Sequence, residues 1–231
     1  DPITKLTWDN AVLIGEATAN TLGVASGDVV RVTVGSRSVE GPVLVQPGQC
    51  EHTATVTLGY GRDWPGQVAS GAGFNAYPIR TSESLWTASG GTIQPTGGTE
   101  ELIRTQDHYA IDTVGGQGTQ ARMPLIFREA SVDSFREHPD FARDHSHVIS
   151  SLSLFEETQF EGANYRWGMA TDLSKCTGCS ACVIACQAEN NIPIVGKDQV
   201  RMGREMHWLR IDRYYRFRKD GDGWDTRQPA S

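Results

Sequence analysis

The sequence has no long hydrophobic run and little positive charge. A membrane-spanning helix needs about 18 or more consecutive apolar residues, and no such window occurs among the 231 residues, so nothing here is expected to cross a bilayer alone. Lys and Arg number 21 against 28 Asp and Glu, which gives a formal net charge of −7 at pH 7. This balance disfavours nucleic-acid binding as the main task. The chain opens without an apolar signal segment, so any export signal is expected outside it.

Cysteine is scarce outside one short segment. Of the five cysteines, four fall within eleven residues. The four are Cys176, Cys179, Cys182 and Cys186. A disulfide framework spreads its cysteines along the chain, so this grouping favours metal binding over disulfides. The fifth cysteine, Cys50, follows a Pro-Gly turn signal, and we expect a half-buried thiol there rather than a ligand.

Glycine is abundant, with 25 residues, and favours turn-rich β structure. Residues 11–22 begin as an apolar run and then become helical before a glycine. Alternating valines in residues 29–34 predict a strand, and Gly35 predicts a tight turn into a returning strand. Residues 53–58 alternate again. We therefore predict a small, closed or nearly closed β-barrel over residues 1–80, because closure would remove exposed strand edges.

The rest of the chain divides into a connector and a second module. Residues 81–165 are predicted to form an extended connector, since residues 81–120 are rich in Gly, Thr and Ser and poor in apolar side chains. Residues 166–231 hold the cysteine group and are predicted to be the start of an incomplete α+β ferredoxin-like domain. The whole chain is thus expected to be mixed and β-rich.

The cysteine group has the spacing C-x₂-C-x₂-C-x₃-C. Thiolates at the two-residue spacing can converge on one iron–sulfur cube, and Gly178 lets the backbone approach it closely. In two-cluster ferredoxins the fourth cysteine of this run ligates the other cluster. We therefore expect Cys176, Cys179 and Cys182 to share one [4Fe-4S] cluster and Cys186 to serve a second. The remaining ligands are expected beyond Ser231 or on another chain.

Two other readings of the four cysteines stay open. A zinc site would more often pair two separated CxxC knuckles. A redox-active CxxC disulfide, or thiols with a purely structural role, is the other reading. Each predicts a protein without iron or sulfide.

Weaker candidates lie elsewhere in the chain. His145 and His147 form an H-x-H pair in a charged connector, without carboxylate or cysteine companions, so we do not expect a metal there. The segment 59–62, Gly-Tyr-Gly-Arg, could cradle a pterin phosphate, but a structural turn is the expected role.

Residues 197–219 are basic, with eight Lys or Arg against three Asp or Glu, a net charge of +5. Alternation in residues 208–213 predicts a strand with one solvated or partner-facing side. Aromatic residues and Arg are enriched at interfaces, so we expect part of residues 208–217 to be buried against protein, with no nucleic acid as partner.

Several stretches resemble a known family. Residues 166–193, which run from RWGMATDLSK into CTGCSACVIACQAENNIP, and the following VGKDQVRMGREMHWLRIDRYYR resemble the iron–sulfur component of bacterial alternative complex III. Residues 10–49, with LGYGR and GAGFNAYPIR after them, resemble the C-terminal β-barrel domain of molybdopterin enzymes. In that family a molybdopterin-oxidoreductase-like part is fused to a four-cluster ferredoxin part in the same order. Gln187 stands where bacterial ferredoxins often have Pro, as in the multi-cluster type.

The resemblance implies a non-catalytic electron relay. It implies several [4Fe-4S] clusters and a [3Fe-4S] cluster in the complete protein, with no molybdopterin bound. The implied partners are an integral-membrane quinol-binding subunit and multi-haem cytochrome subunits, at the periplasmic face of a bacterial inner membrane. The implied reaction is electron transfer from quinol to a cytochrome c-type acceptor. Two alternatives are a molybdenum oxidoreductase acting on a sulfur compound, and a zinc-stabilised binding module.

Overall fold

A computed structural model describes residues 3–63, 66, 69–106, 121–122, 128–143, 154, 165, 168–213, 215–220 and 223–230. The chain forms two compact units, one of residues 1–120 with 178–231 and one of residues 121–177. Each unit is described by itself below. The domain boundaries expected from the sequence stay predictions.

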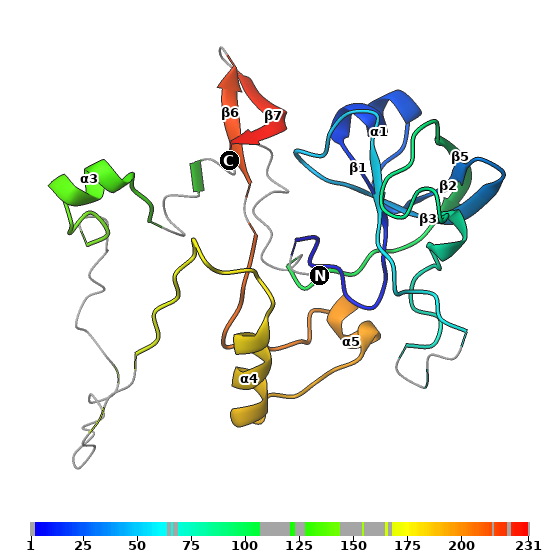
Figure 1. Cartoon of the computed structure of the whole chain (residues 1–231). Coiled ribbons are helices and arrows are strands. Elements are labelled where there is room, and N and C mark those ends of the chain that lie inside the picture. The colour runs from blue at the N-terminus through cyan, green and yellow to red at the C-terminus, as the bar shows by residue number, and fades with distance from the viewer. Residues whose placement is uncertain are drawn as a thin grey trace. The chain divides into compact units, whose positions relative to one another are not determined.

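The centre of the first unit is a mixed five-stranded sheet in the order β4-β1-β3-β2-β5 (Figure 1). Its strands are β1 (Val12–Ile14), β2 (Asp28–Val34), β3 (Arg37–Val45), β4 (Ala54–Val56) and β5 (Thr92–Thr99). β1 and β3 are parallel, whereas the other neighbours are antiparallel. The β-rich character of the chain is therefore confirmed. Closure into a barrel is not, because β4 and β5 end the order without a described pairing between them.

The helices are few and short. They are α1 (Glu16–Leu22), the 3₁₀ turn η1 (Tyr77–Ile79), α3 (Val132–Glu137), α4 (Ala181–Glu189) and α5 (Lys197–Arg201). A hairpin of β6 (Arg216–Asp220) and β7 (Gly223–Ala230) follows them. Within the described part of the chain, none of the helices has the length and apolar character needed to span a membrane.

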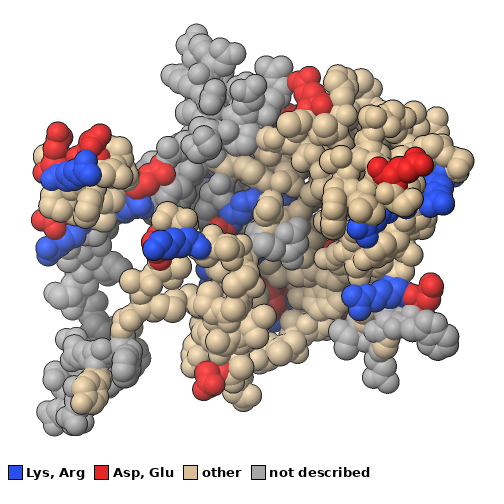
Figure 2. Space-filling model, in the orientation of Figure 1, with Lys and Arg blue, Asp and Glu red and all other residues tan. Residues whose placement is uncertain are grey.

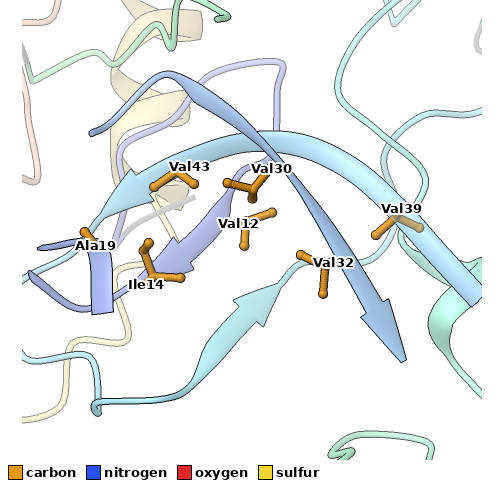
Figure 3. Close-up of a cluster of buried hydrophobic side chains, with 7 residues drawn as sticks. All are labelled: Val12, Ile14, Ala19, Val30, Val32, Val39 and Val43. Atoms are coloured by element: carbon orange, nitrogen blue, oxygen red, sulfur yellow. The ribbon is translucent and has the colours of Figure 1, made fainter. Parts of the chain in front are cut away.

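The core lies on both faces of the β1–β3 pair, because successive side chains of a strand point to opposite faces. Val12 and Ile14 point into one cluster, with valines of β2 and β3 and Ala19 of α1 (Figure 3). Leu13, between them in β1, packs into a second cluster with Leu44 of β3. Both faces of β1 are thus covered, which explains why this short strand is entirely buried.

Two local predictions are confirmed. The β2–β3 hairpin forms around the turn at Gly35, whose φ of +59° lies in the left-handed region that glycine adopts most easily. Helix α1 ends at Gly23 in the left-handed conformation, as a C-terminal glycine commonly does.

Two other expectations are corrected. Residues 92–99, assigned to the connector, form strand β5, which pairs with β2 although it carries only one partly buried side chain, Ile93. Residues 208–213 do not form a strand. Their alternation is real, but the carbonyls of Ile211 and Arg213 accept hydrogen bonds from side chains instead of from a neighbouring strand.

Residues 197–213 are tied to the N-terminal part of the same unit, and we call this set of contacts the clasp. Gln106 donates from Nε2 to the carbonyl of Arg213 (2.5 Å) and accepts from its backbone N–H (3.1 Å). Arg210 donates to the carbonyl of Thr105 (3.0 Å). Lys197 forms an ion pair with Asp9. Part of the basic stretch is therefore half-buried against its own chain, whereas Trp208 is 66% exposed.

The candidate iron–sulfur site

The cysteine motif begins in a loop, which holds Cys176 and Cys179. It continues into the nine-residue helix α4, which holds Cys182 and Cys186. Gly178, with φ of +68°, and Ser180, with φ of +61°, both take the left-handed conformation. These two residues flank Cys179 and directly precede α4, which begins at Ala181. Left-handed backbone is favourable for glycine and costs other residues free energy. The backbone on both sides of Cys179 therefore has a specific conformation, which Gly178 adopts easily and Ser180 adopts at a cost.

All four motif cysteines are free thiols. Cys176, Cys179 and Cys182 are exposed and Cys186 is half-buried. Asn190 donates to the carbonyl of Cys186 (2.9 Å) and lies 3.6 Å from its sulfur. The boundary between the two units falls between residues 177 and 178, so Cys176 is described apart from the other three.

The donor chemistry of this segment fits an iron–sulfur cluster. Exposed thiols that form no disulfide can become the thiolates that such a cluster requires. Within the residues that the structure describes, no three His, Cys, Asp or Glu side chains are gathered closely enough to hold a metal ion. Metal sites seldom exist before the metal arrives, because binding supplies the free energy that orders the ligands.

A local turn precedes Cys176 in the second unit. The Asp172 carboxylate accepts from the backbone N–H (3.0 Å) and the hydroxyl (2.6 Å) of Ser174. The Ser174 side chain and backbone donors lower the pKa of Asp172 from its usual value of 3.8, since they stabilise the charged form. The turn sets the direction of the chain shortly before the first thiol.

An open pocket of about 300 Å³ adjoins Cys179 within the first unit. Three parts of the chain line it: residues 5–7 with Thr105, residues 178–180 with Val183, Ile184 and Gln187 of α4, and His207 with residues 210–212. There is therefore room beside this thiol, and the N-terminal segment forms one wall of that space.

The charged groups of the pocket differ in their partners and in the direction of their pKa shifts. Arg210 is paired with Asp212 through two hydrogen bonds, of 3.1 and 2.9 Å. Burial lowers the pKa of Lys5, while Asp212 opposes that shift. Burial also lowers the pKa of His207, and the charge of Arg210 adds to the effect. His207 Nδ1 lies 3.2 Å from Nε2 of Gln187, which joins residues 207–212 to helix α4.

The other candidates from the sequence have different outcomes. Cys50 is exposed, so the half-buried thiol expected there is wrong: it lies in the chain before β4, outside both buried clusters. The segment 59–62 turns as expected, and a Cβ on Gly61 would lie 2.3 Å from the backbone nitrogen of Asn75. This glycine is needed for close packing. His145 and His147 lie outside the described residues.

Sequence reasoning missed the pocket residues Lys5 and His207. The two are about two hundred positions apart in the chain, and each is a single residue without a motif around it. The clasp brings these segments together, and its contacts are made largely through backbone carbonyls, which carry no sequence signal.

Over part of its length, the chain is similar to iron–sulfur cluster-binding subunits of oxidoreductases, and the matched segment belongs with that class. One relative is the iron–sulfur cluster-binding subunit of menaquinone reductase from Nitratidesulfovibrio vulgaris (strain Hildenborough), 60% identical over 52 residues, which are 22% of this chain and 20% of that protein. Another is the arsenate respiratory reductase iron–sulfur subunit ArrB of Chrysiogenes arsenatis, 58% identical over 26 residues, 11% of this chain and 87% of that sequence. The match to the first relative thus spans one fifth of its length. No protein-family model matches the chain.

Proposed function

We propose that this chain carries electrons through iron–sulfur clusters within a respiratory oxidoreductase. Cys176, Cys179 and Cys182 hold one [4Fe-4S] cluster, and Cys186 ligates a second. The observation that carries the proposal is the run of four free thiols at C-x₂-C-x₂-C-x₃-C spacing, beside an open pocket at Cys179. The similarity to two iron–sulfur subunits of reductases supports it.

The finer form of the proposal follows the family resemblance. The chain is then part of the iron–sulfur component of alternative complex III, at the periplasmic face of a bacterial inner membrane. Electrons pass from an integral-membrane quinol-binding subunit to multi-haem cytochrome subunits. The complete protein holds a [3Fe-4S] cluster as well, and its β domain is a scaffold without molybdopterin. The clasp fits this role, because it ties the scaffold to residues that follow the cysteine loop.

The chain's own residues have three tasks in such a relay. The thiolates ligate iron, the left-handed backbone at Gly178 and Ser180 orients Cys179, and the surroundings set the reduction potential. A cluster supplies one-electron chemistry when bound. No acid, base or nucleophile is needed for that reaction.

The test is metal analysis of the protein purified without oxygen, together with electron paramagnetic resonance of the reduced sample. We expect iron and acid-labile sulfide, and loss of a cluster signal in Cys179→Ser. The matched control is Cys50→Ser, which changes an exposed thiol outside the motif and should leave iron and sulfide unchanged.

Three results would contradict the proposal. Zinc without iron or sulfide would favour the binding module. Stoichiometric molybdenum or tungsten in the complete protein would favour a molybdenum oxidoreductase. Equal loss of iron in Cys50→Ser and Cys179→Ser would mean that the motif is not the specific site.

A further inference from the structure

The pocket beside Cys179 is shared between two distant parts of the chain. One wall is formed by residues 178–180 together with Val183, Ile184 and Gln187 of α4. Lys5, Leu6 and Thr7 form another. The second wall belongs to the N-terminal segment that leads into the sheet. Whatever occupies the space beside the Cys179 thiol therefore meets side chains from outside the cysteine motif.

Three charged side chains line this pocket, two cations and one anion, so together they carry one net positive charge: Lys5, Arg210 and Asp212. Arg210 is neutralised by its two hydrogen bonds to Asp212. No ion pair joins Lys5 to a carboxylate within the described part of the chain, and its ammonium group donates to the carbonyl of Ile211 (2.5 Å). That bond holds a half-buried positive charge at the pocket wall.

A positive charge beside an iron–sulfur cluster favours the reduced state. The cluster and its thiolates carry net negative charge, and reduction adds one electron more. Coulomb attraction to a nearby cation grows with that added charge and is less screened where the cation is partly buried. Net charge and surrounding donors are among the factors that set cluster potentials.

We propose that Lys5, from the N-terminal segment, raises the reduction potential of the cluster held by Cys179 by placing a positive charge in the pocket beside that thiol. The inference rests on the proposed function and deepens it. It gives the β-rich part of the chain a task in electron transfer that needs no cofactor of its own. Lys5 acts on the cluster through its positive charge and is not a ligand of iron.

The experiment is a potentiometric titration of the full protein, purified without oxygen and followed by electron paramagnetic resonance. The signal of interest is the one lost in Cys179→Ser. Lys5→Gln removes the charge but keeps a donor for the Ile211 carbonyl, and we expect its midpoint potential to shift to more negative values. Lys5→Arg keeps the charge and should titrate like the wild type.

Two further variants separate charge from structure. Lys197→Gln removes another lysine of the clasp, which is paired with Asp9 and does not line the pocket. It should leave the midpoint potential unchanged. Asp212→Asn removes a negative charge that lines the pocket and should shift the midpoint potential to more positive values. The shift in midpoint potential expected for Asp212→Asn is opposite in sign to that of Lys5→Gln, so it tests the proposal even where Lys5→Gln fails to fold.

The outcomes distinguish this inference from the proposed function. Wild-type protein without iron and sulfide would remove both. Clusters present in the wild type, with an unchanged midpoint potential in folded Lys5→Gln, would overturn only the role of Lys5. Equal shifts in Lys5→Gln and Lys197→Gln would also overturn it, because they would reflect a loosened clasp. Shifts of the same sign in Lys5→Gln and Asp212→Asn would contradict the electrostatic account.

Discussion

In the sheet, Val12, Ile14, Val30 and Val43 are fully shielded from solvent, whereas helix α4 has no buried residue although its sequence is largely apolar. Ile184 of α4 is 63% exposed. The sheet has its own hydrophobic core, which supplies most of the free energy of folding in ordinary domains. The cysteine segment has no such core among its described residues. The comparison teaches that packing orders the sheet, whereas the cysteine segment lacks that source of order and would gain it from the proposed ligation of a cluster.

The charged surface follows the same division of roles. On the face drawn in Figure 2, acidic and basic side chains of the described residues are interspersed. In the sheet, Arg31 and Glu40 pair across β2 and β3 at exposed positions (2.5 Å), where such a pair contributes little to stability. In the clasp, by contrast, the polar contacts join segments that are distant in the sequence.

We expect the largest difference in the free energy of unfolding when one isoleucine is truncated in each region, Ile14 in the sheet and Ile184 in helix α4. Ile14→Ala leaves a cavity in the sheet core and should lower the free energy of unfolding by about 2–5 kcal/mol. Ile184→Ala removes a side chain that is mostly in water, so its cost should stay within about 0.5 kcal/mol in the cluster-free protein. Chemical denaturation of the two variants measures the difference. Similar losses would mean that α4 belongs to the same packed core.

A substitution in the clasp should lower the free energy of unfolding by an intermediate amount. Gln106 is 3% exposed and bonds both backbone groups of Arg213, so Gln106→Ala removes two partly buried hydrogen bonds. We expect a loss of about 1–3 kcal/mol in the free energy of unfolding. Gln49→Ala is a matched control, since that side chain bonds only the exposed hydroxyls of Thr53 and Thr55. Equal losses in both variants would contradict the importance of the clasp.

The turn before Cys176 should make the smallest contribution to stability, and this contribution should depend on pH. Because the pKa of Asp172 is lowered in the folded turn, its contribution is present above the usual value of 3.8 and is lost as the pH falls through the lower, folded value. The backbone amide of Ser174 should report this titration by nuclear magnetic resonance. Asp172→Asn should abolish it. A titration midpoint at or above 3.8 would contradict the turn.

The sheet was the part most accessible from sequence. Alternating valines in residues 29–34 and a glycine at position 35 encode a hairpin locally, because strand alternation and turn chemistry both act within a few residues. Strand β5 could not be found this way. It is an edge strand that carries Pro95 and a single partly buried side chain, and it is held to β2 by backbone pairing that any residue type can provide.

The candidate site also has a part that could be predicted from sequence and a part that could not. The cysteine spacing is a local signal, so the candidate ligands follow from sequence alone. The wall contributed by Lys5 does not, because it depends on contacts between segments about two hundred residues apart. The strand predicted over residues 208–213 failed for a related reason: alternation describes a face, but Lys5 and Gln106 bind the backbone carbonyls that a strand would need.

Hydrogen exchange of the same protein with and without its clusters tests the central comparison most directly. The account predicts that the amides of β1, β2 and β3 exchange slowly and equally in both forms. It also predicts that the amides of residues 178–190 become protected only when the clusters are bound, since ligation orders that segment. Strong protection of residues 178–190 without clusters, or loss of protection in the sheet when the clusters are removed, would contradict it.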